Sequence, residues 1–298
     1  MRTRVGLGTY RCPDVHWAAV MAAQSGADWL DTAPNYAAGL AEQEVSQVLA
    51  RYSHVRVSTK VGFIPVSARR DILGEGVLTV SEVESGYNLS PDYVRWQVAR
   101  SRRALGRIPD LVFLHNPEHK CPAEQANERL YAAFTALEQA CSDGEIHAYG
   151  VATWSGFSRG VFDIPTLLGA AFRAGGPDHH LQAVQLPLSL VHLAPIAQAL
   201  EGKGVLADAH AAGLGVFASA PLHGGEVPGM FTRELLDLIA PDRSPAQAAL
   251  SVVASAPGVR RVLLSTTKQE HWAEAVTALD GPVLSRETLK RITDVLGT

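Results

Sequence analysis

The chain has 298 residues, of which 47% are hydrophobic and 19% are charged, an ordinary composition for a globular protein with a large core. The net charge of −4 and the pI near 6.3 give no reason to expect binding to nucleic acids or anionic membranes. We find no apolar signal core and no apolar run long enough to span a bilayer. The three cysteines are scattered, which argues against a disulfide framework and predicts a cytoplasmic protein.

In the first half of the chain, short apolar segments alternate with helical patterns. The predicted strands are residues 5–10, 27–31, 55–60 and 111–114, and the predicted helices are residues 13–25, 41–51, 91–105 and 123–142. A long insertion, about 62–89, separates the third strand from its helix. Long connections of this kind are usually functional, so we expect the insertion to cover the strand ends and shape a pocket.

The second half continues the alternation. Its predicted strands are residues 146–153, 181–185, 215–219 and 259–264, and its helices are residues 161–173, 205–212, 231–239, 245–255, 270–279 and 285–296. Residues 187–204 show no regular pattern, and residues 220–230 are a loop rich in glycine and proline.

Eight strand–helix alternations predict a parallel sheet, and their number in a chain of this length predicts an α/β protein with a (β/α)8 barrel. We expect a single domain over residues 1–298. An open doubly wound sheet would instead need a glycine fingerprint between its first strand and helix. The only match, Gly213–Ala218, enters a strand and does not leave one, so it is a chance match.

In a barrel of this kind, catalytic groups lie at the carboxyl ends of the strands. Here those ends carry a carboxylate, an ammonium and an imidazole, from Asp31, Lys60 and His115. Tyr36 follows Asp31 by one turn. Each residue alone has an ordinary structural explanation, such as a cap or a packed aromatic. Their expected convergence on one rim favours a functional site.

The residue types indicate a reaction. A phenol has an ordinary pKa near 10, and a neighbouring ammonium favours the phenolate and lowers that pKa. The carboxylate would hold the lysine in place, and the histidine would orient a substrate oxygen. Together they form a general acid and a polarising site for a carbonyl oxygen. Since there is no G-x-S-x-G motif and no cysteine at these strand ends, the expected reaction partner is an external hydride donor.

Seven segments, in order along the chain, resemble the aldo-keto reductases. They are Gly6–Tyr10, Asp31–Tyr36, Ser58–Lys60, Phe113–Glu118, Tyr149–Trp154, Gln185–Pro187 and Ser219–Leu222. The resemblance implies a catalytic tetrad of Asp31, Tyr36, Lys60 and His115, with Tyr36 as proton donor. It also implies a nicotinamide cofactor across the mouth of the barrel. The candidate cofactor-binding residues are Thr9, Tyr10, Asp31, Thr153, Gln185, Ser219, Pro221, Leu222, Ser265, Thr266, Thr267, Lys268, His271 and Glu274.

By the same resemblance, Gln185 and the Thr153 region hold the carboxamide, while the loop after residue 219 and residues 265–275 hold the pyrophosphate and adenosine. Three departures matter. Ser219 stands where the family often has an aromatic residue that stacks on the nicotinamide. Ala152 and Thr153 replace a usual serine and asparagine, and Ala275 stands where asparagine is common.

The third departure bears on the choice of cofactor. Ser265 and His271 stand where basic residues often hold the 2′-phosphate, although Lys268 could substitute. We therefore expect NADPH, with NADH possible. No metal is expected, because the spacing of Asp178-His179-His180 fits no zinc pattern.

The leading hypothesis is an NAD(P)H-dependent reductase that acts on a small-molecule carbonyl compound, or the reverse alcohol oxidation. A second hypothesis is a non-redox isomerase or lyase that uses Tyr36 and Lys60 as acid and base. A third is a cofactor-sensing regulatory protein, similar to the β subunits of potassium channels. We expect no nucleic-acid or membrane partner, and the sequence leaves a monomer and a homo-oligomer both open.

Overall fold

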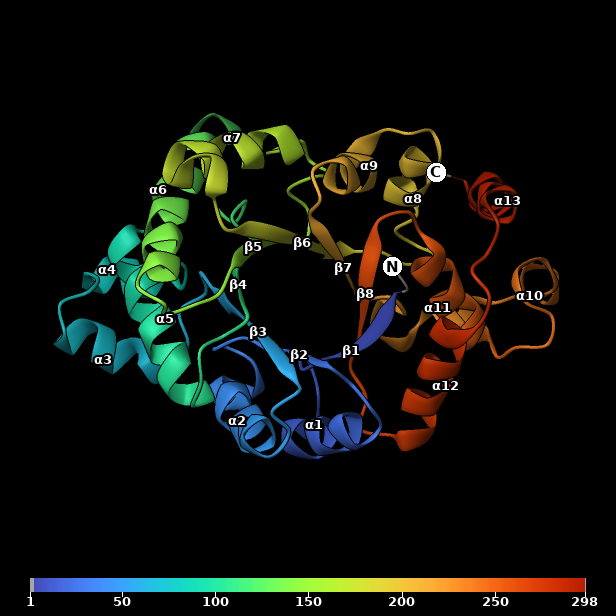
Figure 1. Ribbon diagram of the computed structural model, residues 1–298, viewed down its shortest axis with the longest axis horizontal. Coiled ribbons are helices and arrows are strands. Elements are labelled where there is room, and N and C mark those ends of the chain that lie inside the picture. The colour runs from blue at the N-terminus through green and yellow to red at the C-terminus, as the bar shows by residue number, and fades with distance from the viewer. Residues whose placement is uncertain (1–2, 298) are drawn as a thin grey trace. The chain divides into compact units, whose positions relative to one another are not determined.

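A computed structural model describes residues 3–297 (Figure 1). Eight strands follow one another in sequence order in a closed barrel, and the described pairings are parallel. The predicted (β/α)8 fold is confirmed. The strands are β1 (Arg4–Gly8), β2 (Trp29–Asp31), β3 (Arg56–Val61), β4 (Leu111–His115), β5 (Tyr149–Ala152), β6 (Leu181–Pro187), β7 (Gly215–Ser219) and β8 (Val259–Leu264).

The chain forms two compact units. One unit is Leu7–Ala183, and the other combines the segment up to Gly6 with the chain from Val184 onward. The expectation of a single domain stays a prediction. All four residues of the candidate tetrad belong to the Leu7–Ala183 unit.

In the Leu7–Ala183 unit, the long helices pack side by side in chain order outside the strands (Figure 1). They are α1 (Val15–Gln24), α2 (Ala41–Arg51), α5 (Pro91–Leu105), α6 (Ala123–Ser142) and α7 (Ile164–Gly175). Shorter helices lie between them, namely η1 (Ala37–Gly39), η2 (Val66–Ala68), α3 (Arg69–Gly74) and α4 (Val80–Ser85), and η3 (Gly176–Asp178) follows α7. The insertion 62–89 therefore contains three short helices that the sequence analysis did not predict.

The other unit contains α8 (Ala194–Leu200), α9 (Gly204–Ala211), η4 (His223–Gly225), η5 (Val227–Met230), α10 (Arg233–Ile239), α11 (Pro245–Ser255), α12 (Gln269–Asp280) and α13 (Arg286–Leu296). The expectation of irregular structure over 187–204 was wrong, since α8 lies there. This helix has only seven residues and no side-chain cap at its start, so it leaves a weak periodic signal.

The strand register explains where the candidate residues lie. In the pairing of β2 with β3, Asp31 lies opposite Ser58, so Lys60 is two residues further along the same face. In the pairing of β3 with β4, Lys60 lies opposite Phe113, two residues before His115. The carboxyl ends of three neighbouring strands thus carry the carboxylate, the ammonium and the imidazole.

Within residues 3–297, no helix is both long enough and apolar enough to cross a membrane. The three cysteines are free thiols. The cytoplasmic location inferred from the sequence stays a prediction.

Gly150 on β5 allows the packing of the Leu7–Ala183 unit to be tested. A Cβ at Gly150 would lie 2.5 Å from the carbonyl oxygen of Ala183 and 2.7 Å from the Phe113 ring. Because the backbone oxygen cannot give way easily, we expect Gly150→Ala to lower the free energy of unfolding by about 2 kcal/mol. Urea denaturation measures this change. Gly169→Ala, in α7 with nothing within 4 Å of the new Cβ, is the control and should not destabilise the fold; equal stability of both variants would contradict the prediction.

Candidate active site

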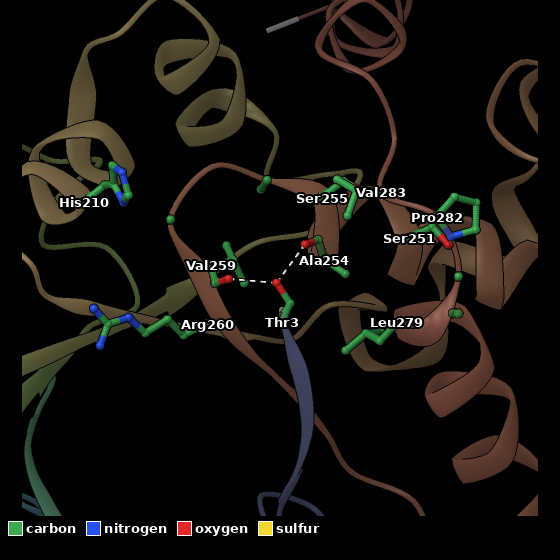
Figure 2. A pocket seen from close by; sticks show the side chains of 14 residues that line it. Thr3, His210, Ser251, Ala254, Ser255, Val259, Arg260, Leu279, Pro282 and Val283 are labelled. Atoms are coloured by element: carbon green, nitrogen blue, oxygen red, sulfur yellow. Dashed lines mark hydrogen bonds between the residues drawn. The ribbon is translucent and has the colours of Figure 1, made fainter. Parts of the chain in front are cut away.

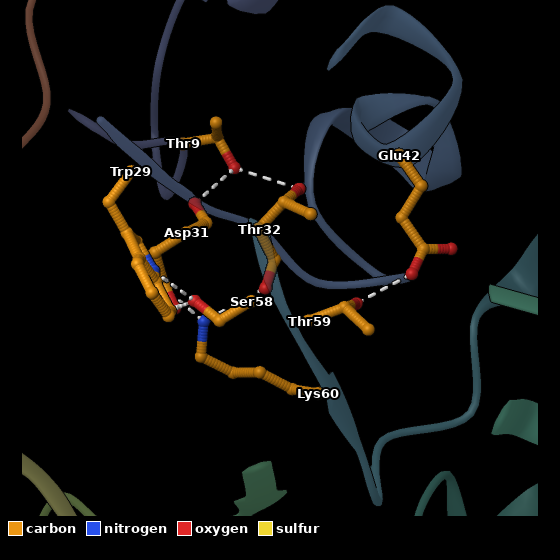
Figure 3. Close-up of polar contacts among 8 residues, drawn as sticks. All are labelled: Thr9, Trp29, Asp31, Thr32, Glu42, Ser58, Thr59 and Lys60. Atoms are coloured by element: carbon orange, nitrogen blue, oxygen red, sulfur yellow. Dashed lines mark hydrogen bonds and ion pairs between the residues drawn. The ribbon is translucent and has the colours of Figure 1, made fainter. Parts of the chain in front are cut away.

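A buried ion pair joins the ends of β2 and β3. The Lys60 ammonium nitrogen Nζ lies 2.6 Å from Oδ2 of Asp31, and it donates a second hydrogen bond to the carbonyl oxygen of Thr32 at 2.9 Å (Figure 3). Asp31 is 4% exposed and Lys60 is 2% exposed. Charges at this depth are stable only when they are paired and hydrogen-bonded, which is the arrangement seen here.

Two neighbours hold the carboxylate of this pair from the other side. The Ser58 hydroxyl donates to Oδ1 of Asp31 at 2.7 Å, and the indole N–H of Trp29 donates to the same Ser58 oxygen at 2.9 Å (Figure 3). The sequence analysis assigned neither residue a role in holding the pair. A signal was available, because Trp29 and Ser58 stand two positions before Asp31 and Lys60 and therefore share their strand faces.

Tyr36 and His115 lie against this ion pair. The Lys60 nitrogen is 4.9 Å from the centroid of the Tyr36 ring. The His115 ring meets the Tyr36 ring edge-on, with centroids 5.9 Å apart and an interplanar angle of 81°. The structure thus brings together all four residues predicted as a tetrad. Phe63, from the start of the insertion, packs on the other side of His115 at 4.9 Å.

The electrostatics of the phenol differ from the expectation. Burial, followed by the charge of Asp31 and the proximity of Tyr10, raises the pKa of Tyr36 well above its ordinary value. The predicted lowering of this pKa by Lys60 is therefore not seen. The reason is that the lysine charge is paired with Asp31 at 2.6 Å and stands over the ring. Tyr36 is a neutral phenol across the physiological pH range and can act as a proton donor.

The other two titratable groups shift in the opposite direction. Burial and the positive charge of Lys60 lower the pKa of His115 well below its ordinary value, so the imidazole is neutral. Burial also lowers the pKa of Lys60, although Asp31 opposes that shift by attraction and by its hydrogen bond. A neutral donor, a neutral imidazole and a paired ammonium suit the polarisation of an uncharged carbonyl oxygen.

The loop that carries Tyr36 has an unusual backbone. Ala37 and Ala38 follow it with φ angles of 46° and 54°, in the left-handed region that L-residues occupy at a cost. Within residues 3–297, the non-glycine residues with positive φ all lie in the connections that follow β1, β2, β4 and β7, including the short helices η1 and η4: Arg11, Ala37, Ala38, Asn116, Lys120, Ala220 and His223. Such conformations concentrate at functional sites.

Comparison with known proteins identifies the family. Residues 5–236 match the sequence model of the aldo/keto reductase family. The chain belongs to the aldo/keto reductase family. A D-threo-aldose 1-dehydrogenase from a Pseudomonas species is 33% identical over 152 residues, which span 46% of this chain and 44% of that protein. The matched segment is thus less than half of the relative.

Solved structures of aldo-keto reductases share the fold. One from Klebsiella pneumoniae, in complex with NADPH, is 20% identical with a TM-score of 0.68, covering 99% of this chain and 95% of the other. A holo-form aldo-keto reductase from Bacillus halodurans is 18% identical with a TM-score of 0.69, covering 99% and 92%. At these identities the similarity supports the barrel architecture.

In this aldo/keto reductase, three predicted cofactor residues lie near the tetrad. Thr9 is buried at the end of β1, and its hydroxyl contacts the Asp31 carbonyl oxygen at 3.1 Å. Tyr10 is 56% exposed, and its ring centroid is 5.2 Å from that of Tyr36. The Thr153 hydroxyl donates to Oε1 of Glu118 at 2.7 Å and accepts from the Gly156 amide at 2.7 Å. Its only proton is committed within the protein.

Glu118 is a residue that the sequence analysis quoted without a role. Besides Thr153, its Oε1 accepts the backbone amides of Trp154 and Ser155 at 3.1 and 2.9 Å. The Asn116 side-chain oxygen also accepts the Trp154 amide, at 2.9 Å. The loop after β4 thereby fixes the loop after β5. Trp154 is half-exposed on that loop.

The remaining predicted cofactor residues belong to the other unit. Gln185 is buried on β6, and its amide nitrogen has no hydrogen-bond partner within residues 3–297. A carbonyl oxygen of a ligand would satisfy it, which fits the predicted role toward a carboxamide. Ser219 is the last residue of β7, and its carbonyl oxygen accepts the Leu188 amide at 3.1 Å. Pro221 is buried and Leu222 is half-buried.

The predicted phosphate and adenosine segment leads into α12. Ser265, Lys268 and His271 are exposed, Thr267 and Glu274 are half-buried, and the buried Thr266 hydroxyl accepts the Lys268 amide at 3.1 Å. No side chain caps the start of α12. A free helix N-terminus beside an exposed lysine suits a phosphate group, so these residues fit a dinucleotide.

A cavity of about 310 Å³ lies elsewhere, at the amino ends of β1 and β8 (Figure 2). The Thr3 hydroxyl on its wall is 2.9 Å from the Ala254 carbonyl oxygen and 2.8 Å from that of Val259. None of the predicted site residues lines it. Within residues 3–297, no group of three or more His, Cys, Asp or Glu side chains is arranged to hold a metal ion.

The neutral imidazole makes stability depend on pH. The folded state keeps His115 unprotonated, whereas the unfolded chain takes up a proton below about pH 6.5. This contribution is therefore present above pH 6.5 and is lost as the pH falls. Between pH 6.5 and 5.5 we expect it to remove up to about 1 kcal/mol from the free energy of unfolding. Urea denaturation should show a smaller loss for His115→Asn over this interval; equal losses in both proteins would contradict the prediction.

Proposed function

We propose that this chain is an NADPH-dependent oxidoreductase that reduces an aldehyde or ketone to an alcohol, with Tyr36 as the general acid. The observation that carries the proposal is the neutral phenol held against a buried Lys60–Asp31 ion pair. Family membership supports the reaction class, since the tetrad was predicted from the family's motifs. NADPH as the cofactor agrees with the ligand in the Klebsiella pneumoniae structure.

In the unit that includes the chain from Val184 onward, Gln185 would face the carboxamide of the cofactor and the start of α12 would face a phosphate. When bound, NADPH supplies the hydride for the carbonyl carbon. The preference for NADPH over NADH depends on Lys268, since Ser265 and His271 stand where the family often has basic residues for the 2′-phosphate.

The residues of the chain have separate tasks in this reaction. The carbonyl oxygen accepts hydrogen bonds from the Tyr36 hydroxyl and from the neutral His115 ring, which hold and polarise it. As the carbon is reduced, the oxygen takes the Tyr36 proton and the product is an alcohol. The phenolate left on Tyr36 is stabilised by the Lys60 ammonium, which Asp31 keeps in place.

Removing the phenolic proton tests the acid. Tyr36→Phe should leave the dissociation constant for NADPH unchanged within about twofold and lower kcat by a factor of roughly 10² to 10⁴. Binding is followed by quenching of tryptophan fluorescence, and turnover by absorbance at the reduced nicotinamide band. Tyr131→Phe, the same change on a ring of α6 that packs against Arg173, should keep turnover.

The outcomes also separate the alternatives. Undiminished turnover in Tyr36→Phe would remove this residue as the acid. No affinity of the wild-type chain for NADPH or NADH would support a non-redox isomerase or lyase. Tight dinucleotide binding without turnover on any carbonyl compound would support a cofactor-sensing protein.

A second candidate reaction is the oxidation of an aldose at C1. The observation that favours it is the similarity to D-threo-aldose 1-dehydrogenase over 46% of the chain. In this direction the C1 carbon of the cyclic sugar gives up a hydride to the oxidised cofactor. Its hydroxyl proton passes to the Tyr36 phenolate, and a lactone forms.

The two directions should differ in their dependence on pH. Because burial raises the pKa of Tyr36, the phenolate required for oxidation is scarce at neutral pH. We therefore expect aldose oxidation to rise by up to about tenfold per pH unit between pH 7 and 9, while carbonyl reduction stays level or falls. Initial rates with NADP⁺ and a panel of aldoses measure this, with non-sugar secondary alcohols as the comparison. An oxidation rate independent of pH would argue against Tyr36 as the base.

A further inference from the structure

One buried carboxylate close to the tetrad has no part in the proposed reaction. Glu42 is the second residue of α2, six positions after Tyr36, and is 2% exposed. The Thr59 hydroxyl of β3 donates to its Oε1 at a short 2.6 Å (Figure 3), and Ser101 of α5 also hydrogen-bonds to it. The side chain of this buried acid therefore joins α2 to β3, the next element of the chain, and to α5.

The hydrogen bond between Glu42 and Thr59 matters for the site because Thr59 is the neighbour of Lys60 on β3. Thr59 and Lys60 are consecutive on β3, so their side chains leave the strand in opposite directions. Figure 3 shows the Glu42 side chain extending from its helix to Thr59, while the Lys60 side chain runs the other way toward Asp31. Glu42 therefore holds Thr59, the residue next to Lys60, on the face of β3 opposite to the Lys60 side chain.

The segment between Tyr36 and Glu42 needs such an anchor. It contains Ala37 and Ala38 in the left-handed region and Gly39 at φ 96°. This backbone persists only if the surrounding structure holds it on both sides. On the side before Tyr36, Thr32 is bonded to Lys60 through its carbonyl oxygen. On the side after it, Glu42 is bonded to Thr59.

The Glu42–Thr59 hydrogen bond forms a clamp between α2 and β3, and the charges around this clamp also act on Lys60. Burial raises the pKa of Glu42, against the effects of Thr59, Ser101, Arg100 and Lys60. The charge of Glu42 adds to the attraction of Asp31 for the Lys60 ammonium and acts to raise the pKa of Lys60, while burial lowers it. Tyr36 and His115, the other titratable groups facing Lys60, are uncharged at neutral pH.

A chain of buried side chains continues from the clamp toward His115. The Gln97 amide donates to the Ser101 hydroxyl at 2.9 Å, and Tyr93 contacts the Gln97 oxygen at 3.5 Å. The Tyr93 hydroxyl donates to the carbonyl oxygen of Phe63 at 3.1 Å. Since the Phe63 ring packs on His115, the same polar network supports the surroundings of three tetrad members.

We propose that Glu42 is a positioning residue for the tetrad: it fastens the helix after Tyr36 to the strand that carries Lys60, and it holds a carboxylate beside the residue next to that lysine. The proposal rests on the proposed function for its kinetic part. Its electrostatic part stands on the structure alone and is measured without turnover.

The charge is tested by titrating Lys60 directly. The chain has five lysines, so ¹³C-lysine NMR gives few signals, and Lys60→Arg assigns the one of interest. Glu42→Gln keeps an oxygen acceptor for Thr59 but removes the charge. We expect the Lys60 midpoint to fall by roughly one pH unit in this variant. An unchanged midpoint in a folded Glu42→Gln protein would overturn the proposal.

The matched control is another buried glutamate on a helix. Glu138 of α6 is 7% exposed and accepts the Tyr149 hydroxyl at 2.7 Å and the His180 amide at 2.8 Å. Glu138→Gln removes a buried charge of the same kind, away from the tetrad. The Lys60 midpoint should be the same in this variant as in the wild type; an equal shift in both variants would count against a specific role for Glu42.

The clamp is tested by Thr59→Val, which keeps the Glu42 side chain and removes the hydroxyl that bonds to it. We expect kcat to fall by about tenfold, because the acid and the lysine lose their fixed spacing. KM, the NADPH dissociation constant and the Lys60 midpoint should change little. Thr59→Ser, which restores the hydroxyl, should restore kcat. Wild-type kcat in Thr59→Val would overturn the positioning role, even where Glu42→Gln fails to fold.

Failure of the proposed function has a different signature. In that case the wild-type chain shows no NADPH-dependent turnover, and the kinetic comparison has no reference. The Lys60 titration still decides the electrostatic role of Glu42. A shifted Lys60 midpoint with no turnover in any variant would keep the inference about charge and reject the oxidoreductase.

Discussion

The ion pair between Lys60 and Asp31 is the interaction on which the rest of the site depends. Two charges that are almost fully buried must meet each other, because water cannot solvate them there. Their contact fixes the ends of β2 and β3 relative to one another. Ser58 donates to the other oxygen of the carboxylate and itself accepts the Trp29 indole N–H, so the pair is held without access to solvent. Replacing either Lys60 or Asp31 by a neutral residue would leave the other charge buried and unpaired, which is strongly destabilising.

This pairing sets the state of the neighbouring groups. A lysine whose charge is already matched by Asp31 exerts little pull on the Tyr36 phenol, and burial keeps that phenol protonated. The same burial keeps His115 neutral. The site thus holds its proton on the tyrosine in the resting state. The charge that develops during reduction appears only when a carbonyl oxygen takes that proton, beside an ammonium already in place.

Much of this arrangement was predictable from the sequence. Alternating apolar strands and helices gave the barrel, and α2, α5, α6, β7 and β8 begin and end where the patterns place them. Three strand ends and the turn after β2 gave the four candidate residues, and the family resemblance predicted that they form a tetrad. The pattern failed at α8 and in the insertion, where helices of six or seven residues carry too few turns for a periodic signal. The raised pKa of Tyr36 could not be read from residue types, because it depends on burial depth and on how fully Asp31 satisfies the lysine.

The left-handed alanines after Tyr36 carry a consequence for how this chain can change over time. Glycine at either position would relax the backbone, so selection for thermal stability is expected to favour it. The gain would come with a looser hinge beside the acid. A chain that retains alanine at both positions trades some robustness for a rigid loop, so sequence variation at these two sites should track demands on turnover more closely than demands on folding.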